Sequence, residues 1–284
     1  MNPGKGRLIL MRSFVQVVML ALGLIAILPV YVVLVNATRS IEQINMGLSL
    51  VPSANILNNW QVLSSTGAMR IWRGFANSAF ISICATTLSI YCSAMTAYGL
   101  HAYRFKGRLF LLTVILIIIM LPGTLSFIGF YQSIVRMKLL NSYIPLILPG
   151  MAAAVTVLFL RQYMLSVLSA EMIDAARIDG AGEYRIFNII VLPIMAPALA
   201  AQSIFSFVGS WNNFMVPFVL ISDKKRYTLP MMVQTLRGNI YNSEMGGIYL
   251  GLAISLVPIL IFYAFFSRFI ITGISIGSIK EKVV

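Results

Sequence analysis

Residues 169–193 read SAEMIDAARIDGAGEYRIFNIIVLP, a polar segment that lies between two long apolar runs. The segment holds four of the chain's eight acidic residues, namely Glu171, Asp174, Asp179 and Glu183. Ser169 is a candidate N-cap, and carboxylates in the first turn suit the positive end of a helix dipole. Positions 171, 175, 179 and 183 recur every four residues, so one continuous helix would align them on one face.

Two glycines should end that helix, because Gly180 and Gly182 accept backbone angles that other residues avoid. A second short helix should follow, and Pro193 and Pro197 should mark the start of the next apolar run. Small residues around the bend would let a partner approach the backbone closely: Ala175, Ala176, Gly180 and Ala181. An ordinary amphipathic helix resting on a membrane surface would show a similar pattern.

The composition around this segment is typical of a membrane protein. Of the 284 residues, 59% are hydrophobic and 10% are charged, whereas a soluble domain is about half apolar and about a quarter charged. The net charge of +13 comes from 21 Lys and Arg against 8 Asp and Glu. The basic residues form short clusters between apolar runs, which indicates the flanks of membrane spans rather than a nucleic-acid-binding face.

Six apolar runs are long enough to cross a bilayer, which takes about 20 residues at about 1.5 Å each. We therefore expect an all-α polytopic membrane protein with a single transmembrane domain over residues 1–284. The expected spans are residues 14–35, 75–100, 109–135, 139–160, 196–221 and 245–267. Pro122 and Gly123 should kink the third span. The first run could instead be a cleaved signal peptide, but its apolar stretch exceeds the roughly 7–15 residues of a signal core.

The basic residues predict that both termini are cytoplasmic. Arg104, Lys106 and Arg108 lie in one short loop, and the N-terminal tail holds three further basic residues. An even number of spans would then place both ends of the chain on the same side. With this orientation, residues 169–193 are also cytoplasmic.

The 169–193 segment resembles the EAA loop of ATP-binding-cassette importer permeases. The likeness rests on Asp174-Ala-Ala-x-x-Asp-Gly180, followed after nine residues by Ile190-x-Leu-Pro193. Asp174 stands where the family name implies Glu, which keeps the charge on a shorter arm. Two later stretches resemble carbohydrate permeases, in particular the smaller permease subunit of maltose-type transporters: FVGSWNNFMVP at 207–217 and YTLP at 227–230.

This resemblance implies that the segment carries a coupling helix, which docks on a cytoplasmic ATPase. The residues implied in coupling are Glu171, Asp174, Ala175, Ala176, Asp179, Gly180, Ala181, Ile190, Leu192 and Pro193. The chain contains no Gly-x-x-x-x-Gly-Lys-Ser/Thr, so ATP and Mg would be bound by the partner ATPase and no cofactor by this chain.

The resemblance also implies the assembly. It comprises a second permease subunit in a heterodimer, an ATPase dimer and an extracytoplasmic solute-binding protein, all at the cytoplasmic membrane of a bacterium or archaeon. Membrane lipid is a further expected partner, and nucleic acid is not.

The fifth expected span supplies candidate substrate contacts, namely Gln202, Trp211, Asn212, Asn213 and Phe214. Polar side chains in a span usually face other protein or water, and an aromatic ring beside amides suits a sugar. Hydrogen bonding between helices explains the same residues equally well. An oligosaccharide is the preferred cargo, and glycerol phosphate, polyols and amino acids are the alternatives.

Two other functional classes fit less well. Ion-coupled transporters often carry charges inside their spans or show internal repeats, and none of the six expected spans contains a charge. An intramembrane enzyme would need a nucleophile, a base or metal ligands, but the chain has one histidine, His101, and two cysteines, Cys84 and Cys92. We therefore predict a transport subunit rather than an enzyme.

Overall fold

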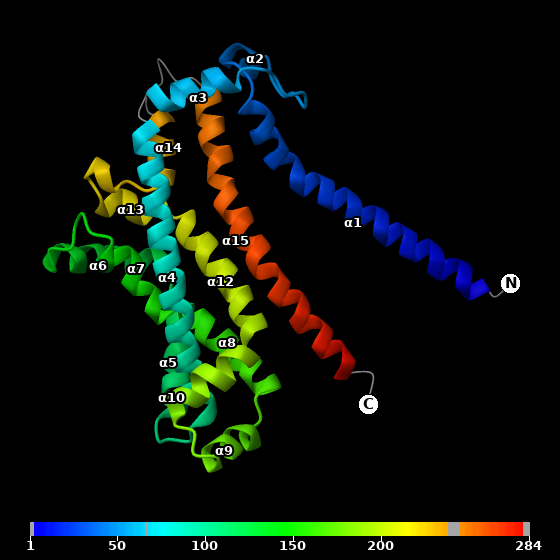
Figure 1. Cartoon of the computed structure of the whole chain (residues 1–284), viewed down its shortest axis with the longest axis vertical. Helices are drawn as coiled ribbons and strands as arrows, with labels where there is room; N and C mark the ends of the chain where they lie inside the picture. Colours follow the sequence, from blue (N-terminus) through cyan, green and yellow to red (C-terminus); the bar gives the residue numbers. More distant parts are fainter. Residues whose placement is uncertain (1–2, 66–67, 238–244, 281–284) are drawn as a thin grey trace. The chain divides into compact units, whose positions relative to one another are not determined.

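The computed structural model describes residues 3–65, 68–237 and 245–280, which are helical with short connections and without a strand. The chain divides into two compact units: Met1–Ile71 with Met232–Leu256, and Trp72–Met231 with Val257–Val284. The α-helices, labelled in Figure 1 except for α11, are α1 Pro3–Asn36, α2 Ile41–Asn45, α3 Ile56–Ser65, α4 Ala68–Ala102, α5 Arg108–Met120, α6 Gly123–Arg136, α7 Ile144–Ile147, α8 Ala154–Val167, α9 Ala170–Ile178, α10 Glu183–Arg185, α11 Leu192–Ile194, α12 Ala196–Trp211, α13 Met215–Leu220, α14 Leu229–Arg237 and α15 Met245–Lys280. Two 3₁₀ turns, Leu148–Ala152 and Lys224–Arg226, and a π-helix, Ile186–Val191, complete the described structure.

Four helical stretches of the described residues are long and apolar enough to cross a membrane: Met11–Asn36, Ile71–Ala102, Ile144–Val167 and Met245–Phe269. A fifth candidate is a pair of helices, Glu183–Ile194 and Ala196–Trp211, which meet at a bend of 80°. These stretches overlap five of the six expected spans. The count of six crossings stays a prediction.

The expected third span, residues 109–135, is two helices rather than one. α5 ends at Met120, and α6 begins at Gly123. Proline has no N–H to continue a helix, and it disfavours helical angles in the preceding residue. Leu121, directly before Pro122, accordingly has an extended backbone with φ −74° and ψ 130°. The 13 residues of α5 rise about 20 Å, less than the roughly 30 Å of a bilayer core.

The expected fifth span, residues 196–221, is also interrupted. α12 ends at Trp211, and α13 begins only at Met215. The Oδ1 atom of Asn213 accepts a hydrogen bond from the backbone N–H of Val216 at 3.3 Å, which satisfies one donor at the start of the new helix. Asn212 and Asn213, which we expected inside a continuous span, therefore lie at a helix break.

The first unit is organised around a buried arginine. The guanidinium of Arg39 donates to Asn36 Oδ1 at 3.1 Å, to the Gly47 carbonyl at 3.0 Å and to the Gln43 carbonyl. Asn59 donates from Nδ2 to two further carbonyls of the same turn, at 2.8 and 3.0 Å. A side chain at Gly246 would collide with Asn59, since a Cβ there would lie 2.3 Å from its Oδ1. These contacts fix the connection between α1 and α3.

The core of the second unit lies where α4 meets α8 and the 169–193 segment. Its members include the buried residues Ala94, Ala97, Tyr98, Leu160, Met164, Ile186, Phe187 and Val191. Toward the N-terminus of α4, the buried side chains include several small hydroxyls: Ser78, Ser82, Thr86, Ser89 and Ser93. Small residues let membrane helices approach closely. Gly150 shows this approach directly, because a Cβ there would lie only 3.2 Å from the Ala85 carbonyl oxygen.

Candidate functional site

The 169–193 segment folds into a helix, a tight turn and a second arm, as predicted. The Ser169 hydroxyl caps α9 by accepting the N–H of Met172 at 3.4 Å. At the other end, the N–H of Ala181 bonds to the Ala176 carbonyl and that of Gly180 to the Arg177 carbonyl, both at 3.0 Å. This pair of bonds is a Schellman motif, which requires a left-handed residue. Gly180 supplies it with φ +79°.

The second arm is less regular than we expected. After α10, residues Ile186–Val191 form a π-helix, and the short α11 leads into the 80° bend before α12. Isolated π-turns in helices are often found at functional sites. The predicted break of the helix is confirmed, since α9 ends at Ile178 and Glu183 begins the next helix.

Glu183 is the centre of a polar network that joins the two arms. The Nε of Arg177 donates to Glu183 Oε1 at 2.7 Å, and its Nη1 donates to Asp174 Oδ1 at 2.9 Å. The hydroxyl of Tyr98 donates to Glu183 Oε2 at 2.9 Å. The guanidinium also lies 5.5 Å from the centre of the Tyr103 ring. The hydrogen bond from Arg177 lowers the pKa of Glu183 to about 2, so this carboxyl is ionised at neutral pH.

Three further contacts fix the segment to α4. The Nε2 of His101 lies 3.2 Å from the carbonyl oxygen of Leu168, just before the cap of α9. The Tyr91 hydroxyl donates to Asn188 Oδ1 at 3.2 Å. The ring of Phe187 lies between those of Tyr91 and Tyr98, with both centroid distances at 5.6 Å. A displacement of the 169–193 segment would therefore act on α4.

The predicted coupling residues divide between surface and core. Those on the surface are Glu171, Asp174, Ala175, Asp179, Gly180 and Pro193, and those half-buried are Ala181, Ile190 and Leu192. Ala176 is buried in the core of the unit, so the expectation that it is displayed for a partner is wrong. Its position follows from the helix period, because Ala176 shares the inward face of α9 with the buried Ile173.

Two large side chains of this segment, which sequence reasoning missed, are the most exposed apolar groups near the turn. Ile178 is 86% exposed and Tyr184 is 75% exposed. Met172, Ala175 and Ile178 follow one another at a spacing of three along α9, so they share one exposed face. That spacing was readable in the sequence, but only burial in the structure shows which face points outward. The exposed face thus carries both apolar and acidic side chains.

The predicted substrate contacts are not gathered in one place. Gln202 accepts a hydrogen bond from Thr156 of α8 at 3.4 Å. This bond joins two helices, which is the alternative to a sugar contact. Trp211 is 1% exposed and packs edge-on against Phe75 at 5.5 Å. Asn213 caps α13, Phe214 packs beside the cluster of Ile134 and Leu220, and Asn212 is exposed. Nine residues of helix, about 14 Å, separate Gln202 from Trp211.

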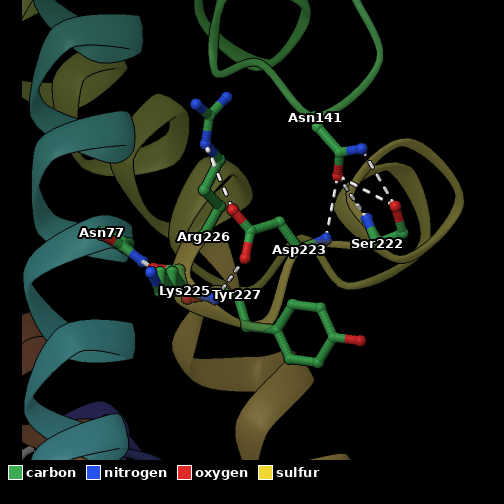
Figure 2. A network of polar contacts seen from close by, with 7 residues as sticks. All are labelled: Asn77, Asn141, Ser222, Asp223, Lys225, Arg226 and Tyr227. Carbon is green, nitrogen blue, oxygen red and sulfur yellow. Dashed lines mark hydrogen bonds and ion pairs between the residues drawn. The ribbon is translucent and has the colours of Figure 1, made fainter.

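The other end of α4 belongs to a second network, the Asn141 cluster (Figure 2), formed by Asn77, Asn141, Ser222, Asp223, Lys225, Arg226 and Tyr227. Asn141 Oδ1 accepts the N–H groups of Ser222 at 2.7 Å and of Asp223 at 2.9 Å. Asn77 donates to the carbonyls of Lys225 at 3.1 Å and Tyr227 at 2.9 Å. This cluster ties α4, the turn before α7 and the turn after α13 together.

The described structure is that of a helical membrane protein with a polar two-armed loop, which is anchored to a long helix and bears an exposed face. The family of binding-protein-dependent transport system inner membrane components matches residues 89–275. The chain belongs to this family. It is thus an inner-membrane transport subunit rather than an enzyme, and membership implies an ATPase and a binding protein as partners.

Several relatives cover nearly the whole chain. The arabinooligosaccharides transport system permease protein AraQ of Halalkalibacterium halodurans is 38% identical over 91% of this chain and 93% of its own length. AraQ of Bacillus subtilis is 32% identical over 91% and 92%. The sn-glycerol-3-phosphate transport system permease protein UgpE of Escherichia coli O1:K1 / APEC is 32% identical over 88% and 92%.

A solved structure shares the fold. A chain of a bacterial ABC transporter involved in the import of the acidic polysaccharide alginate matches with a TM-score of 0.76, covering 91% of this chain and 96% of that one. The identity is 21%, so this likeness concerns the fold.

Proposed function

We propose that this chain is a permease subunit of an ATP-driven sugar importer, with an oligosaccharide as its cargo. The observation that carries the proposal is the exposed face of α9, held on a two-armed loop that is fixed to α4. The names of the AraQ relatives support an oligosaccharide. The UgpE relative, at 32% identity against 38% for AraQ of Halalkalibacterium halodurans, keeps glycerol phosphate as the second candidate.

In this proposal, the exposed face of α9 seats in a groove of the ATPase subunit. Met172, Ala175 and Ile178 supply exposed apolar groups, and Glu171, Asp174 and Asp179 supply exposed acidic groups beside them. Protein interfaces combine apolar contacts with polar and charged ones. ATP and Mg would be bound by the ATPase. Movement of the docked helix would reach α4 through Glu183, Phe187 and Asn188.

The remaining parts of the assembly follow from the same proposal. A second, different permease subunit completes the pathway, and a solute-binding protein delivers the sugar from outside. The chain makes six crossings within one transmembrane domain, with both termini in the cytoplasm. Asn212, exposed at the break after α12, is the best-placed of the five predicted substrate residues to meet a sugar. The other four already pack against or bond to this chain.

The docking face can be tested by adding a charge to it. Ile178→Asp places a carboxylate where an apolar side chain would be desolvated by the partner, so we expect sugar uptake to fall by about tenfold or more. Membrane insertion should not change, because Ile178 is 86% exposed. Leu48→Asp is the matched control, because Leu48 is 76% exposed in the other unit.

A cysteine at Ala175 provides the direct measurement, after Cys84 and Cys92 are replaced by serine. We expect it to cross-link to the ATPase subunit in membranes. Normal uptake by Ile178→Asp, together with no cross-link from position 175, would rule out the docking face. Stimulation of ATPase activity by glycerol 3-phosphate, and by no oligosaccharide, would replace the proposed cargo with the alternative.

A further inference from the structure

A polar pocket lies within the first unit, between α2, α3 and the first residues of α15. Its volume is about 570 Å³, which is within the range of about 300–1,000 Å³ for small-molecule sites. One face of α3 forms a wall of the pocket, because residues 55, 58, 59 and 62 follow one another at helical spacing and all line it. Gly246 of α15 lines the pocket beside Asn59.

Hydrogen bonds fix the two longer walls of the pocket. The N–H of Ser40 donates to Gln43 Oε1 at 3.1 Å, and the N–H of Gln43 donates to Ser40 Oγ at 3.4 Å, so a capping box begins α2. The same Oε1 accepts from Asn55 Nδ2 at 3.4 Å, which links α2 to the start of α3. The pocket therefore keeps its shape without a ligand, and this lowers the ordering cost of binding.

Several amide groups of the pocket form no hydrogen bond with any residue that the structure describes. They are the exposed side-chain amides of Asn58 and Gln61, and the Oδ1 atom of the buried Asn59. An amide group both donates and accepts hydrogen bonds, and so does a hydroxyl. These groups therefore suit a ligand that carries several hydroxyls.

The charge of the lining disfavours an anion. Glu42 lines the pocket, and its carboxylate accepts a hydrogen bond from Ser40 Oγ at 2.6 Å. This bond lowers the pKa of Glu42, so the carboxyl is ionised at neutral pH. Among the described residues, no lysine, arginine or histidine lines the pocket. A phosphate would meet the Glu42 charge with no cation to offset the repulsion.

We propose that this pocket binds one ring of a neutral oligosaccharide. The ring hydroxyls bond to the amides of Asn58 and Gln61 and to the carboxylate of Glu42. Ile41 and Val62, the two aliphatic residues of the lining, contact the carbon atoms of the ring. The hydrogen bonds of the sugar to water are thus replaced, which a hydroxyl requires when it leaves water.

This inference deepens the proposed function and rests on its orientation. The pocket residues 40–62 lie in the connection between the apolar stretches Met11–Asn36 and Ile71–Ala102. With the N-terminus in the cytoplasm, this connection is on the outer side of the membrane, where the sugar arrives. The pocket then holds an arriving chain before it enters the pathway, and it selects a neutral sugar over glycerol phosphate.

The test uses the full-length chain with its co-purifying subunits in nanodiscs, without ATP and without the solute-binding protein. The probe is arabinotriose that carries a photoactivatable diazirine at its reducing end, and peptide mass spectrometry locates the adducts after irradiation. We expect adducts on residues 40–42 and 55–62. Unlabelled arabinotriose should compete for the site, and glycerol 3-phosphate at the same concentration should not.

Removal of single amides should weaken the labelling. Asn58→Ala and Gln61→Ala should each lower the adduct yield by about three- to tenfold, since each loses hydrogen bonds to the sugar. Both residues are exposed, so neither change should affect membrane insertion. Asn45→Ala is the matched control, because Asn45 is an exposed asparagine of α2 that does not line the pocket.

The outcomes separate the pocket from the proposed function. Normal oligosaccharide uptake by the wild-type assembly, with equal adduct yields in wild type, Asn58→Ala and Gln61→Ala, would overturn the pocket and leave the proposed function in place. Competition by glycerol 3-phosphate as strong as that by arabinotriose would also overturn it. A wild-type assembly that takes up no neutral oligosaccharide would overturn the proposed cargo and this inference together.

Discussion

The two ends of α4 are both joined to distant parts of the chain, but through different chemistry. In the 169–193 segment, side chains bond to side chains: Glu183 accepts from Arg177 and from Tyr98. In the Asn141 cluster, most bonds run from side chain to backbone (Figure 2). Asn141 accepts two backbone N–H groups, and Asn77 donates to two backbone carbonyls.

This difference in bonding indicates which end of α4 is rigid and which end can move. Amide-to-backbone bonds hold the path of the main chain itself, so they break only if a turn changes. The Arg177 and Glu183 side chains are 33% and 42% exposed, and exposed ion pairs typically contribute only about 0–1 kcal/mol. Such a bridge can form and break between two states of a transporter. We infer that the Asn141 cluster is the rigid end of α4 and the 169–193 segment the mobile one.

The largest expected effect comes from breaking the Arg177 bridge. Arg177→Met removes the donor to both Glu183 and Asp174, so the two arms of the segment lose their ionic connection. We expect sugar uptake to fall by about tenfold, and amide hydrogen exchange in α9 to become faster. Arg185→Met is the control, since Arg185 is exposed in the same turn. Equal uptake by both variants would mean that the bridge does not transmit movement.

A smaller effect is expected at the opposite end of α4. Asn141→Ala removes the acceptor of two backbone N–H groups and leaves an alanine at φ +56°, so it should destabilise the protein by about 1–3 kcal/mol. Asn141→Gly loses the same bonds but tolerates that backbone angle. Thermal unfolding in detergent should rank wild type above the glycine variant and the alanine variant lowest. A normal melting temperature in both would show that the cluster is not the rigid end of α4.

The smallest effect is expected at the cap of α9. Ser169→Ala removes an acceptor of the Met172 N–H at a rather long 3.4 Å, so the loss should lie near the lower end of about 0.5–2 kcal/mol. Ser169→Asp supplies another capping oxygen and should restore the helix. Hydrogen exchange at the first turn of α9 reports both changes. Faster exchange in the aspartate variant than in the alanine variant would contradict the capping role.

Much of the 169–193 segment could be predicted because its signals are local. A serine cap, a pair of glycines and a proline each act within a few residues, and the structure places the helix start, the Schellman turn and the second arm accordingly. The apolar runs similarly indicate membrane helices. The breaks at Leu121 and Asn212 were harder to place, because a proline or an asparagine can either kink a helix or end it, depending on its neighbours.

The sequence by itself determined the membrane class, the helical fold and the family likeness of the 169–193 segment, because hydrophobic length and backbone preferences are properties of neighbouring residues. Only the tertiary structure decided which face of α9 is exposed and that Glu183 meets Tyr98 from 85 residues away. The same is true of the rings of Phe207 in α12 and Phe262 in α15, whose centroids are 4.0 Å apart. Those outcomes depend on contacts between segments far apart in the chain, which local periodicity does not specify.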